Sequence, residues 1–282
     1  MNVTWHPQNM AVPFCCRRIA SCHLISPRSP AATFSNKVTT RSNNMAEAGG
    51  STMPTDEGMA LYLKAGPNPS SIGDCPFAHY VRIVLAETKT PYEAIPCNKE
   101  TKPKWLIENH NGALPALRHS NRCIVESDVI ADYVNSLNNA CGEVPKGEET
   151  EEKEAKQVTD GFFPAMAKYM KHTPDGDDDD EKLKCNLEAV LQRFETYLTR
   201  DGRKGPFWVG DGMVWTMLDC SLVPKLYHMK VGLKNFKKDA VDLEKDYPGL
   251  ASYVAAALDR ESVKDTLYPE ETVVWGWSNA RL

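Results

Sequence analysis

The sequence predicts an α/β domain followed by an all-helical domain, and two observations lead to this fold class. Between about residues 58 and 138, short apolar runs that end near Gly or Pro alternate with helical patterns in the order β-α-β-α-β-β-α. Beyond Pro145, amphipathic helical patterns continue with few strand signals. A chain of 282 residues is long enough for two such cores. We therefore expect an α/β domain at 58–138, a linker at 139–153 and a helical domain at 154–282.

Each element of the first domain has its own signal. The strands are predicted from short apolar runs bounded by Gly, Pro or Asn, at 60–65, 91–96, 114–117 and 123–125. The helices are predicted from apolar residues at helical spacing, from residue 76 onward, near 102–107 and at 129–134. The second strand has a proline on each side, which is typical of a sheet edge. The run Glu-Ser-Asp at 126–128 supplies an N-cap for the last helix.

The helical domain is predicted from longer amphipathic patterns. Helices are expected at 158–170, 183–198, 221–228 and 250–258, with no helix after the last of these. Thr216 and Asp219 fit a capping box in front of the third helix. The acidic run at 175–181 interrupts the helices. Its contiguous aspartates lack the ligand spacing of a calcium loop, so we interpret the run as a solvated loop.

Residues 1–57 have the composition of a leader segment. The first 46 residues contain no Asp or Glu, five basic residues, many Ser, Thr and Asn, and no long apolar core. These features are typical of an organellar transit peptide rather than a secretory signal, and we favour a plastid over a mitochondrion. A disordered tail, or translation from Met45 or Met53, is the alternative interpretation.

Composition and charge argue against several function classes. The hydrophobic content of 41% and charged content of 25% are ordinary for a soluble globular protein. No apolar stretch approaches the length of about 18 residues that a spanning helix needs. Beyond residue 46 the chain carries all 38 acidic residues but 28 of the 33 basic ones, and an acidic body argues against nucleic-acid binding. The nine cysteines lack C-x-x-C and metal-ligand spacing, so we expect free thiols, a reducing compartment and no metal.

One thiol is distinguished by its position. Cys75 directly precedes Pro76, and proline favours the first turn of a helix. Unpaired backbone N–H groups and the positive end of the helix dipole stabilise a thiolate there, and the thiolate is the nucleophile. Ala78 stands where a dithiol oxidoreductase carries its second cysteine, so redox chemistry at Cys75 needs an external thiol. A buried structural cysteine is the alternative interpretation.

This domain order and four motifs resemble the glutathione transferase superfamily, whose fold is a thioredoxin-like domain followed by an all-helical domain. The run Cys-Pro-Phe at 75–77 is similar to the thiol-active members: omega-class transferases, glutaredoxin-like proteins, chloride intracellular channels and dehydroascorbate reductases. Leu-Pro at 114–115 matches the cis-proline of that fold. Glu-Ser-Asp at 126–128 resembles the pair that binds the γ-glutamyl group, and 216–219 resembles the family's capping box.

Five short segments, in the same order along the chain, resemble one branch of this superfamily, the plant-type dehydroascorbate reductases. They lie at 73–77, 102–105, 127–130, 224–228 and 236–238. Ala78 departs from the Ser that plant members usually carry, and the acidic run and the C-terminal sequence at 275–278 are this chain's own variants. The resemblance implies an oxidoreductase that recycles ascorbate, reducing dehydroascorbate with two glutathione molecules. It further implies glutathione as co-substrate, no bound cofactor, and a monomer.

The resemblance also implies a set of site residues. Cys75 is implied as the catalytic thiol, and Lys64 and Asp74 as the residues that hold ascorbate or dehydroascorbate. The implied glutathione site comprises Lys64, Asp74, Lys102, Leu114, Ser127, His228 and Trp277. Taken without the resemblance, Lys64 is an exposed charge at a strand end, Ser127 is an N-cap and His228 is a packing residue.

The implied chemistry is thiol–disulfide exchange at one cysteine. Cys75 reduces dehydroascorbate and is left as a sulfenic acid, glutathione forms a mixed disulfide, and a second glutathione releases glutathione disulfide. One alternative is an omega-like thioltransferase that acts on mixed disulfides. An alternative of another class is a membrane-inserting protein like the chloride intracellular channels, although His79, Arg82 and Glu87 in the first helix disfavour insertion. A third alternative is a module that binds glutathione without catalysing a reaction.

Overall fold

The α/β domain is built on a mixed four-stranded sheet. The computed structural model describes residues 58–138, 141–142, 144, 147–176 and 179–281, so the predicted leader lies outside the described residues. The strands are β1 (Met59–Lys64), β2 (Glu93–Cys97), β3 (Ala116–His119) and β4 (Arg122–Val125). They lie in the order β2-β1-β3-β4, with β1 and β2 parallel and the other neighbours antiparallel. The edge position of β2 confirms the prediction from its prolines.

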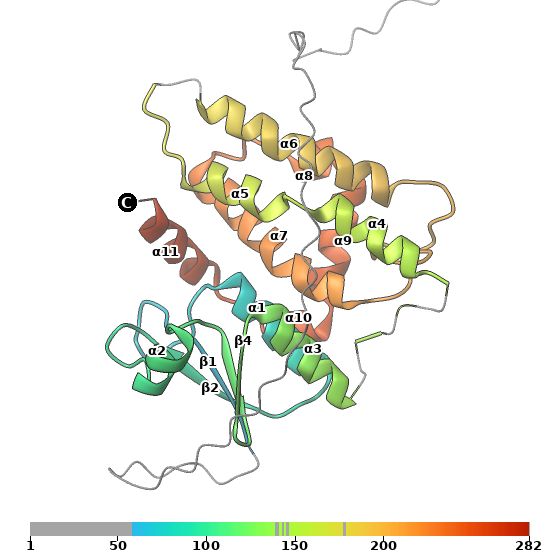
Figure 1. Cartoon of the computed structure of the whole chain (residues 1–282). Coiled ribbons are helices and arrows are strands. Elements are labelled where there is room, and N and C mark those ends of the chain that lie inside the picture. Colours follow the sequence, from blue (N-terminus) through green and yellow to red (C-terminus); the bar gives the residue numbers. More distant parts are fainter. Residues whose placement is uncertain (1–57, 139–140, 143, 145–146, 177–178, 282) are drawn as a thin grey trace, which may run out of the picture. The chain divides into compact units, whose positions relative to one another are not determined.

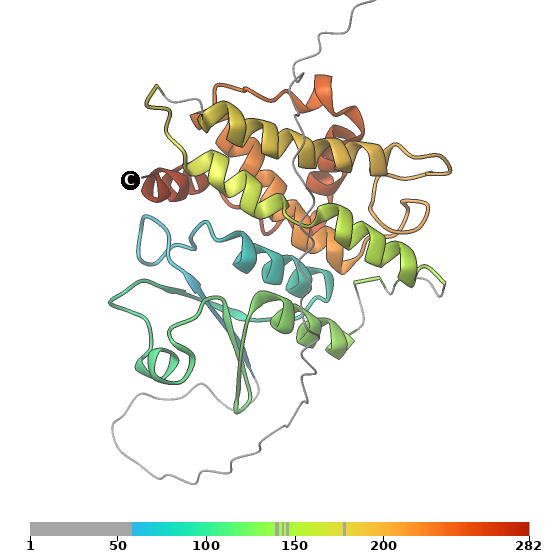
Figure 2. The ribbon, with the colours of Figure 1, turned by 45° about the horizontal axis from the view of Figure 1, so that its top comes forward.

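Helices cover both faces of this sheet. α1 (Pro76–Glu87) and α3 (Ser127–Asn138) cover the face toward the helical domain, and α2 (Lys104–His110) covers the opposite face (Figures 1 and 2). Successive side chains of a strand point to opposite faces. Leu61 is accordingly buried in the core that includes α1 and α3, while Tyr62 packs in the separate cluster that includes α2. This is the α/β arrangement that the sequence predicts.

The second domain consists of helices. They are α4 (Glu149–Thr159), α5 (Phe162–Lys171), α6 (Asp179–Leu198), α7 (Met217–Phe236), α8 (Leu243–Asp246), α9 (Pro248–Asp259), α10 (Glu261–Lys264) and α11 (Glu270–Ala280). The fully buried indole of Trp208 lies among the rings of Phe194, Tyr197 and Tyr253, at centroid distances of 5.1, 5.5 and 5.7 Å. The predicted capping box opens α7, where the Thr216 backbone N–H donates to Asp219 Oδ2 at 2.8 Å.

The helix predicted at 158–170 is two helices. α4 ends at Thr159 and α5 begins at Phe162, because Gly161 between them has a φ of +76°. A left-handed residue cannot continue an α-helix, and glycine adopts that conformation at little cost. α4 also begins at Glu149, so residues 149–153 belong to a helix rather than to the predicted linker.

The acidic run is only partly a loop. Residues 177–178 lie outside the described residues, but Asp179, Asp180 and Glu181 form the first turn of α6. Negative side chains are favourable at that end of a helix. Asp180 also forms an ion pair with the buried ammonium of Lys237. The prediction of a solvated loop across 175–181 is therefore wrong for its last three residues.

The prediction that no helix follows residues 250–258 is wrong. α9 corresponds to the helix expected at 250–258, but α10 and α11 follow it. The overlooked signal for α11 is Pro269 followed by Glu270 and Glu271, since a proline and acidic residues are typical of a helix start. This omission matters because α11 packs against the residues around Cys75.

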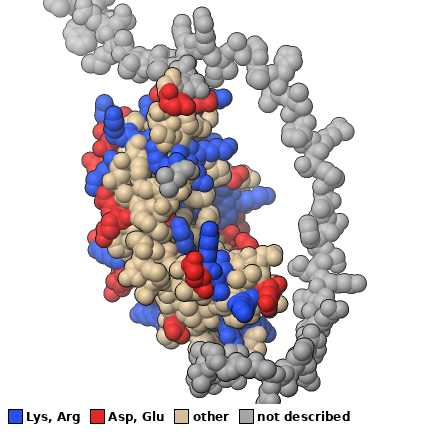
Figure 3. All heavy atoms as spheres, turned by 90° about the vertical axis from the view of Figure 1, so that its left-hand side faces the viewer, with Lys and Arg blue, Asp and Glu red and all other residues tan. Residues whose placement is uncertain are grey.

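Two surface properties bear on function. None of the helices in the described part of the chain is long and apolar enough to cross a membrane. On the face shown in Figure 3, basic and acidic side chains are interspersed with neutral ones and neither sign forms a continuous patch.

Candidate active site

One end of the sheet collects most of the predicted site residues. β1 and β2 run parallel and end together, with Lys64 opposite Cys97. β3 begins where β1 ends, with Ala116 opposite Tyr62, and β4 ends opposite that same Ala116. The segments that leave or enter the sheet at this end carry Lys64, Lys102, Leu114 and Ser127. The strand order therefore brings together residues that are up to 63 positions apart in the sequence.

A tight return after β1 places Cys75 at the same end. Ala65 and Ile72 form an isolated antiparallel bridge, and the Gly73 backbone N–H donates to the Lys64 carbonyl at 2.7 Å. A Cβ on Gly73 would lie 2.6 Å from two carbonyl oxygens of β1 and the residue after it, so only glycine permits this approach. Cys75 then becomes the N-cap of α1, with Pro76 at the first helical position, as the sequence predicts.

The helix start does not give the free thiol a lowered pKa, contrary to the sequence prediction. Burial raises the pKa of the half-buried Cys75 above its ordinary value. The backbone N–H groups of Ala78 and Phe77 act in the opposite direction, the charge of Asp74 raises the pKa further, and that of Lys64 lowers it. Near neutral pH the thiolate is thus the minor form of Cys75 in the free protein.

Lys64 and Asp74 form an ion pair beside Cys75. The Lys64 ammonium lies 2.7 Å from Asp74 Oδ1, and it lies 5.2 Å from the centre of the Trp275 ring of α11. The Lys64 side chain is 45% exposed, whereas that of Asp74 is 12% exposed. A cation with solvent access therefore stands at the site, oriented by a nearly buried carboxylate and an aromatic face.

α7 and α11 close the site from the helical domain. The buried imidazole of His228 on α7 forms a hydrogen bond with the Asp74 backbone, and its centroid lies 6.0 Å from that of Trp277 on α11. Gly276 lies directly against the Asp74 carboxylate, where a Cβ would overlap it. The structure thus brings His228 and Trp277 to the residue before Cys75.

Two buried polar atoms at this position have no hydrogen-bond partner in the described structure. They are Nε2 of His228 and Nε1 of Trp277. Leaving such groups unpaired costs free energy, which a polar ligand repays when it supplies the missing partner. Both atoms are thus buried polar groups close to Asp74 whose hydrogen-bonding capacity is unused.

The other predicted glutathione residues have structural partners of their own. The Lys102 ammonium donates to the Gly112 carbonyl at 2.7 Å. Leu114 packs with the cluster under α2, and its peptide bond to Pro115 is cis, as the resemblance implies. Ser127 is the first residue of α3 and is partly exposed. No described contact joins these three side chains to Cys75.

Sequence reasoning missed two residues that support Cys75. Tyr268 Oη donates to the Cys75 carbonyl at 3.3 Å, and the ring of Tyr268 lies 4.7 Å from that of His79 and 5.2 Å from the Arg82 guanidinium. Trp275, rather than Trp277, is the indole next to Lys64. Both residues follow α9, in the part of the chain where the sequence prediction expected no further helix.

The described residues contain no metal site and no disulfide. No group of three or more His, Cys, Asp or Glu side chains is placed to hold a metal ion, within the part of the chain that the structure describes. The six described cysteines, Cys75 among them, are free thiols.

Comparisons with known proteins match both domains. Residues 71–136 match the family model of the glutathione S-transferase N-terminal domain, and residues 186–256 match that of the glutathione S-transferase C-terminal domain. Both domains of this chain are therefore similar to those of glutathione transferases, in the order expected for that fold.

Among glutathione transferases, the chain is similar to dehydroascorbate reductases. It is 29% identical over 212 residues to the Arabidopsis thaliana protein named glutathione S-transferase DHAR2, covering 75% of this chain and 92% of that protein. It is 27% identical over 224 residues to the rice protein named probable glutathione S-transferase DHAR1, cytosolic, covering 78% and 97%. The structure of Chlamydomonas reinhardtii dehydroascorbate reductase matches with a TM-score of 0.65 at 24% identity, covering 80% of this chain and all of that one.

Proposed function

We propose that this protein reduces dehydroascorbate to ascorbate with two molecules of glutathione, using Cys75 as its only catalytic thiol. The relatives named dehydroascorbate reductases support the reaction. The observation that carries the proposal is the arrangement around Cys75. A single thiol caps α1 beside the Lys64–Asp74 pair, at the end of the sheet where this fold holds glutathione.

The chemistry balances with one protein thiol. The Cys75 thiol and a water molecule give two electrons and two protons to dehydroascorbate, leaving ascorbate and a Cys75 sulfenic acid. Glutathione then displaces water from the sulfenic acid and forms a mixed disulfide. A second glutathione attacks the glutathione sulfur of that disulfide, releasing glutathione disulfide and the Cys75 thiol. Because Ala78 cannot act as a resolving thiol, glutathione fills that role.

The neighbours of Cys75 have roles that fit these steps. Lys64 and Asp74 offer a hydrogen-bond donor and acceptor to the oxygens of the uncharged dehydroascorbate, and the Lys64 charge favours the enolate anion that forms as ascorbate is released. His228 and Trp277 present unpaired polar atoms to the same region. Lys102, the Leu114 backbone and Ser127 bind the glutathione carboxylate, cysteinyl and γ-glutamyl groups in this proposal.

Steady-state turnover tests the proposed function. Purified protein supplied with dehydroascorbate and glutathione should produce ascorbate and glutathione disulfide in equal amounts. Cys75→Ser should lower kcat/KM by at least about 1000-fold, because a hydroxyl cannot take part in disulfide exchange. Cys123→Ser is the matched control, since Cys123 is also partly exposed but lies on β4, and should retain the wild-type rate. Retention of most activity by Cys75→Ser would refute the mechanism.

A thioltransferase that acts on mixed disulfides is the second candidate. It is favoured by the same lone thiol at a helix start, because removal of glutathione from a mixed disulfide also needs only one cysteine. The ratio of kcat/KM for dehydroascorbate to that for a glutathione–cysteamine mixed disulfide separates the two. A ratio above one supports the reductase, and a ratio far below one supports the thioltransferase.

Targeting and assembly complete the proposal. One relative from Arabidopsis thaliana is named as chloroplastic and one from rice as cytosolic. We infer from composition that residues 1–57 direct this protein to a plastid, and a fluorescent fusion with and without this segment tests that inference. We also expect a monomer, which light scattering at several concentrations would check.

A further inference from the structure

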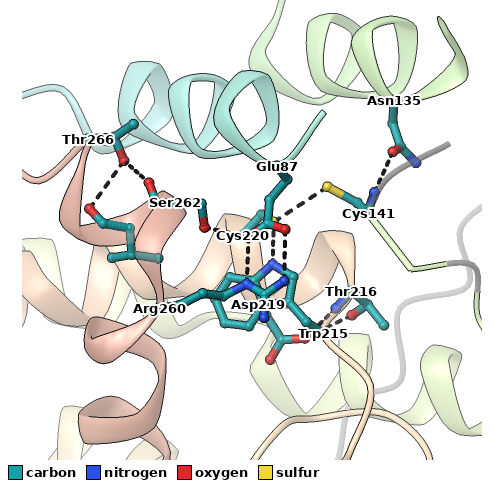
Figure 4. Close-up of polar contacts among 11 residues, drawn as sticks. Glu87, Asn135, Cys141, Trp215, Thr216, Asp219, Cys220, Arg260, Ser262 and Thr266 are labelled. Carbon is teal, nitrogen blue, oxygen red and sulfur yellow. Dashed lines mark hydrogen bonds and ion pairs between the residues drawn. The ribbon is translucent and has the colours of Figure 1, made fainter. Parts of the chain in front are cut away.

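Cys141 and Cys220 are two buried free thiols that the proposed reaction does not use. Cys141 lies in the segment between α3 and α4, which joins the two domains, and Cys220 lies in the first turn of α7. Their sulfurs are 3.9 Å apart (Figure 4). The fold therefore brings into contact two sulfurs that are 79 positions apart in the sequence.

Contacts on both sides hold these two sulfurs in place. The backbone N–H of Cys141 donates to Asn135 Oδ1 of α3 at 3.0 Å. The next residue, Gly142, lies so close to the chain in front of α7 that a Cβ on it would be 2.9 Å from the Trp215 carbonyl oxygen. On the other side, Trp215 Nε1 donates to Cys220 Sγ at 3.1 Å. The surrounding structure thus fixes the approach of the two thiols.

This contact is close to the geometry that a disulfide requires. The S–S bond of a disulfide is about 2 Å long, and cysteines whose side chains point apart cannot form one. The side chains of Cys141 and Cys220 point toward each other, and their sulfurs need to approach by about 2 Å more. Formation of a bond between them therefore requires a local adjustment and no rearrangement of the fold.

We propose that Cys141 and Cys220 form a second redox site, at which a peroxide converts the two thiols into a reversible disulfide that stabilises the fold. The disulfide joins the segment between the two domains to α7. This inference goes beyond the proposed function, because neither sulfur takes part in the reduction of dehydroascorbate.

The oxidation balances in two steps. One sulfur attacks an oxygen of hydrogen peroxide and the O–O bond breaks, which leaves a sulfenic acid and one molecule of water. The other sulfur then attacks the sulfenic sulfur, and the departing hydroxide takes up the thiol proton as a second molecule of water. The two thiols lose two electrons and two protons in total, and the peroxide receives both. Two molecules of a small thiol reverse the reaction by disulfide exchange.

Burial has opposite effects on the two steps. It slows the first step, because it raises the pKa of Cys220 well above its ordinary value and the thiolate is the reactive form. It favours the second step, since glutathione is much larger than a peroxide and does not reach a buried sulfenic acid, whereas the partner sulfur is already in contact. The expected product is thus the internal disulfide and not a mixed disulfide with glutathione.

Peptide mapping after oxidation tests the inference. The full-length Cys75→Ser protein is used, because it lacks the thiol that the proposed reaction oxidises. Exposure to hydrogen peroxide continues until the partly exposed Cys123 is oxidised, and free thiols are then blocked in guanidinium chloride before digestion without reduction. The expected product is a cross-linked pair of peptides containing Cys141 and Cys220, which dithiothreitol separates. Free Cys141 and Cys220 at this point, or a disulfide from either to another cysteine, would overturn the proposal.

Thermal unfolding measures the effect of the disulfide on stability. A link across 79 positions restrains the unfolded chain, so oxidation of the Cys75→Ser protein should raise its Tm by about 5 °C or more, and dithiothreitol should reverse the rise. The rise is measured between the oxidised and reduced forms of each protein, so a variant that starts less stable remains informative.

Two further substitutions in the Cys75→Ser protein show which thiols cause the rise. Cys220→Ala should abolish it, whereas Cys123→Ala, which removes a thiol on β4, is the matched control and should keep it. A rise of equal size in Cys220→Ala, or no rise in the Cys75→Ser protein itself, would overturn the proposal. Neither measurement uses dehydroascorbate, so its result is independent of the proposed function.

Discussion

Cys75 and Cys220 each lie at the start of a helix, but only Cys75 is positioned to react with a substrate. Cys75 is the N-cap of α1, half-buried, and lies next to Lys64. Cys220 lies in the first turn of α7, fully buried, with its sulfur 3.9 Å from that of Cys141 and 3.1 Å from Nε1 of Trp215 (Figure 4). The contrast separates the effect of a helix start from the effects of charge and access.

Burial and the neighbouring groups act differently on the pKa values of the two thiols. Burial raises the pKa of Cys220 well above its ordinary value, and the neighbouring Cys141, Asp219 and Glu87 raise it further. At Cys75 burial also raises the pKa and the Asp74 charge adds to this, but the backbone N–H groups of Ala78 and Phe77 and the Lys64 charge oppose it. Neither helix start lowers the pKa of its thiol, and the partial exposure of the Cys75 sulfur is what distinguishes it from the buried Cys220.

The largest expected effect is on the rates of alkylation. Iodoacetamide should label Cys75 at least about 100-fold faster than Cys141 or Cys220, because the reagent reaches those two only when the structure opens locally. Peptide mass spectrometry at successive times gives the three rates. In guanidinium chloride the rates should converge, which controls for the intrinsic reactivity of each peptide. Equal alkylation rates of the three cysteines in the folded protein would show that Cys75 does not differ from the two buried thiols.

The approach of α11 to the site gives the next largest effect. Gly276→Val places a branched side chain where the Asp74 carboxylate lies, so α11 or Asp74 must move. Small displacements at a reacting centre are costly, and we expect kcat/KM for dehydroascorbate to fall about 10- to 100-fold. Asn279→Val, at an exposed position of the same helix, should keep the wild-type value. Wild-type turnover by Gly276→Val would mean that α11 does not shape the site.

The pH dependence of protein stability tests the burial of His228 on α7. Burial lowers the pKa of His228 to about 4, from 6.5, and the charge of Asp74 opposes this. Between these pH values the unfolded chain binds more protons than the folded one, so acidification destabilises the fold by up to about 1.4 kcal/mol per pH unit through His228. Urea unfolding at pH values from 7 to 4 measures this effect. The difference in the free energy of unfolding between wild type and His228→Gln should become smaller as the pH falls. A constant gap would show that His228 titrates normally.

The smallest expected effect is the opposite influence of Asp74 and Lys64 on the pKa of Cys75. The Asp74 charge raises the pKa of Cys75 and the Lys64 charge lowers it, after the larger effect of burial. The pH midpoint of Cys75 alkylation should therefore fall in Asp74→Asn and rise in Lys64→Met. A shift of both variants in the same direction would show that repacking, and not charge, controls the thiol.

Local signals made much of the fold predictable from the sequence. The strands, the helix that begins at Pro76 and the capping box at Thr216 follow from short patterns, and the structure confirms them. The sequence also identified Cys75 as a helix N-cap, because proline at the first helical position is a local preference.

Properties that depend on tertiary packing were not predictable in the same way. The sequence prediction had the sign of the Cys75 pKa shift wrong, since desolvation depends on residues that pack around the sulfur. The contact of Gly276 with Asp74 joins residues 202 positions apart, and no local pattern encodes it. The break at Gly161 was missed because apolar spacing continues across it, while the backbone there turns left-handed.

The most direct test of the central claim is to locate the glutathione that the enzyme carries during turnover. Enzyme treated with dehydroascorbate and a single equivalent of glutathione, then quenched with acid, should carry one glutathione in a mixed disulfide on the peptide that contains Cys75. A second addition of glutathione should remove it and release glutathione disulfide. A mixed disulfide on any other cysteine, or turnover by an enzyme that never carries one, would contradict the account.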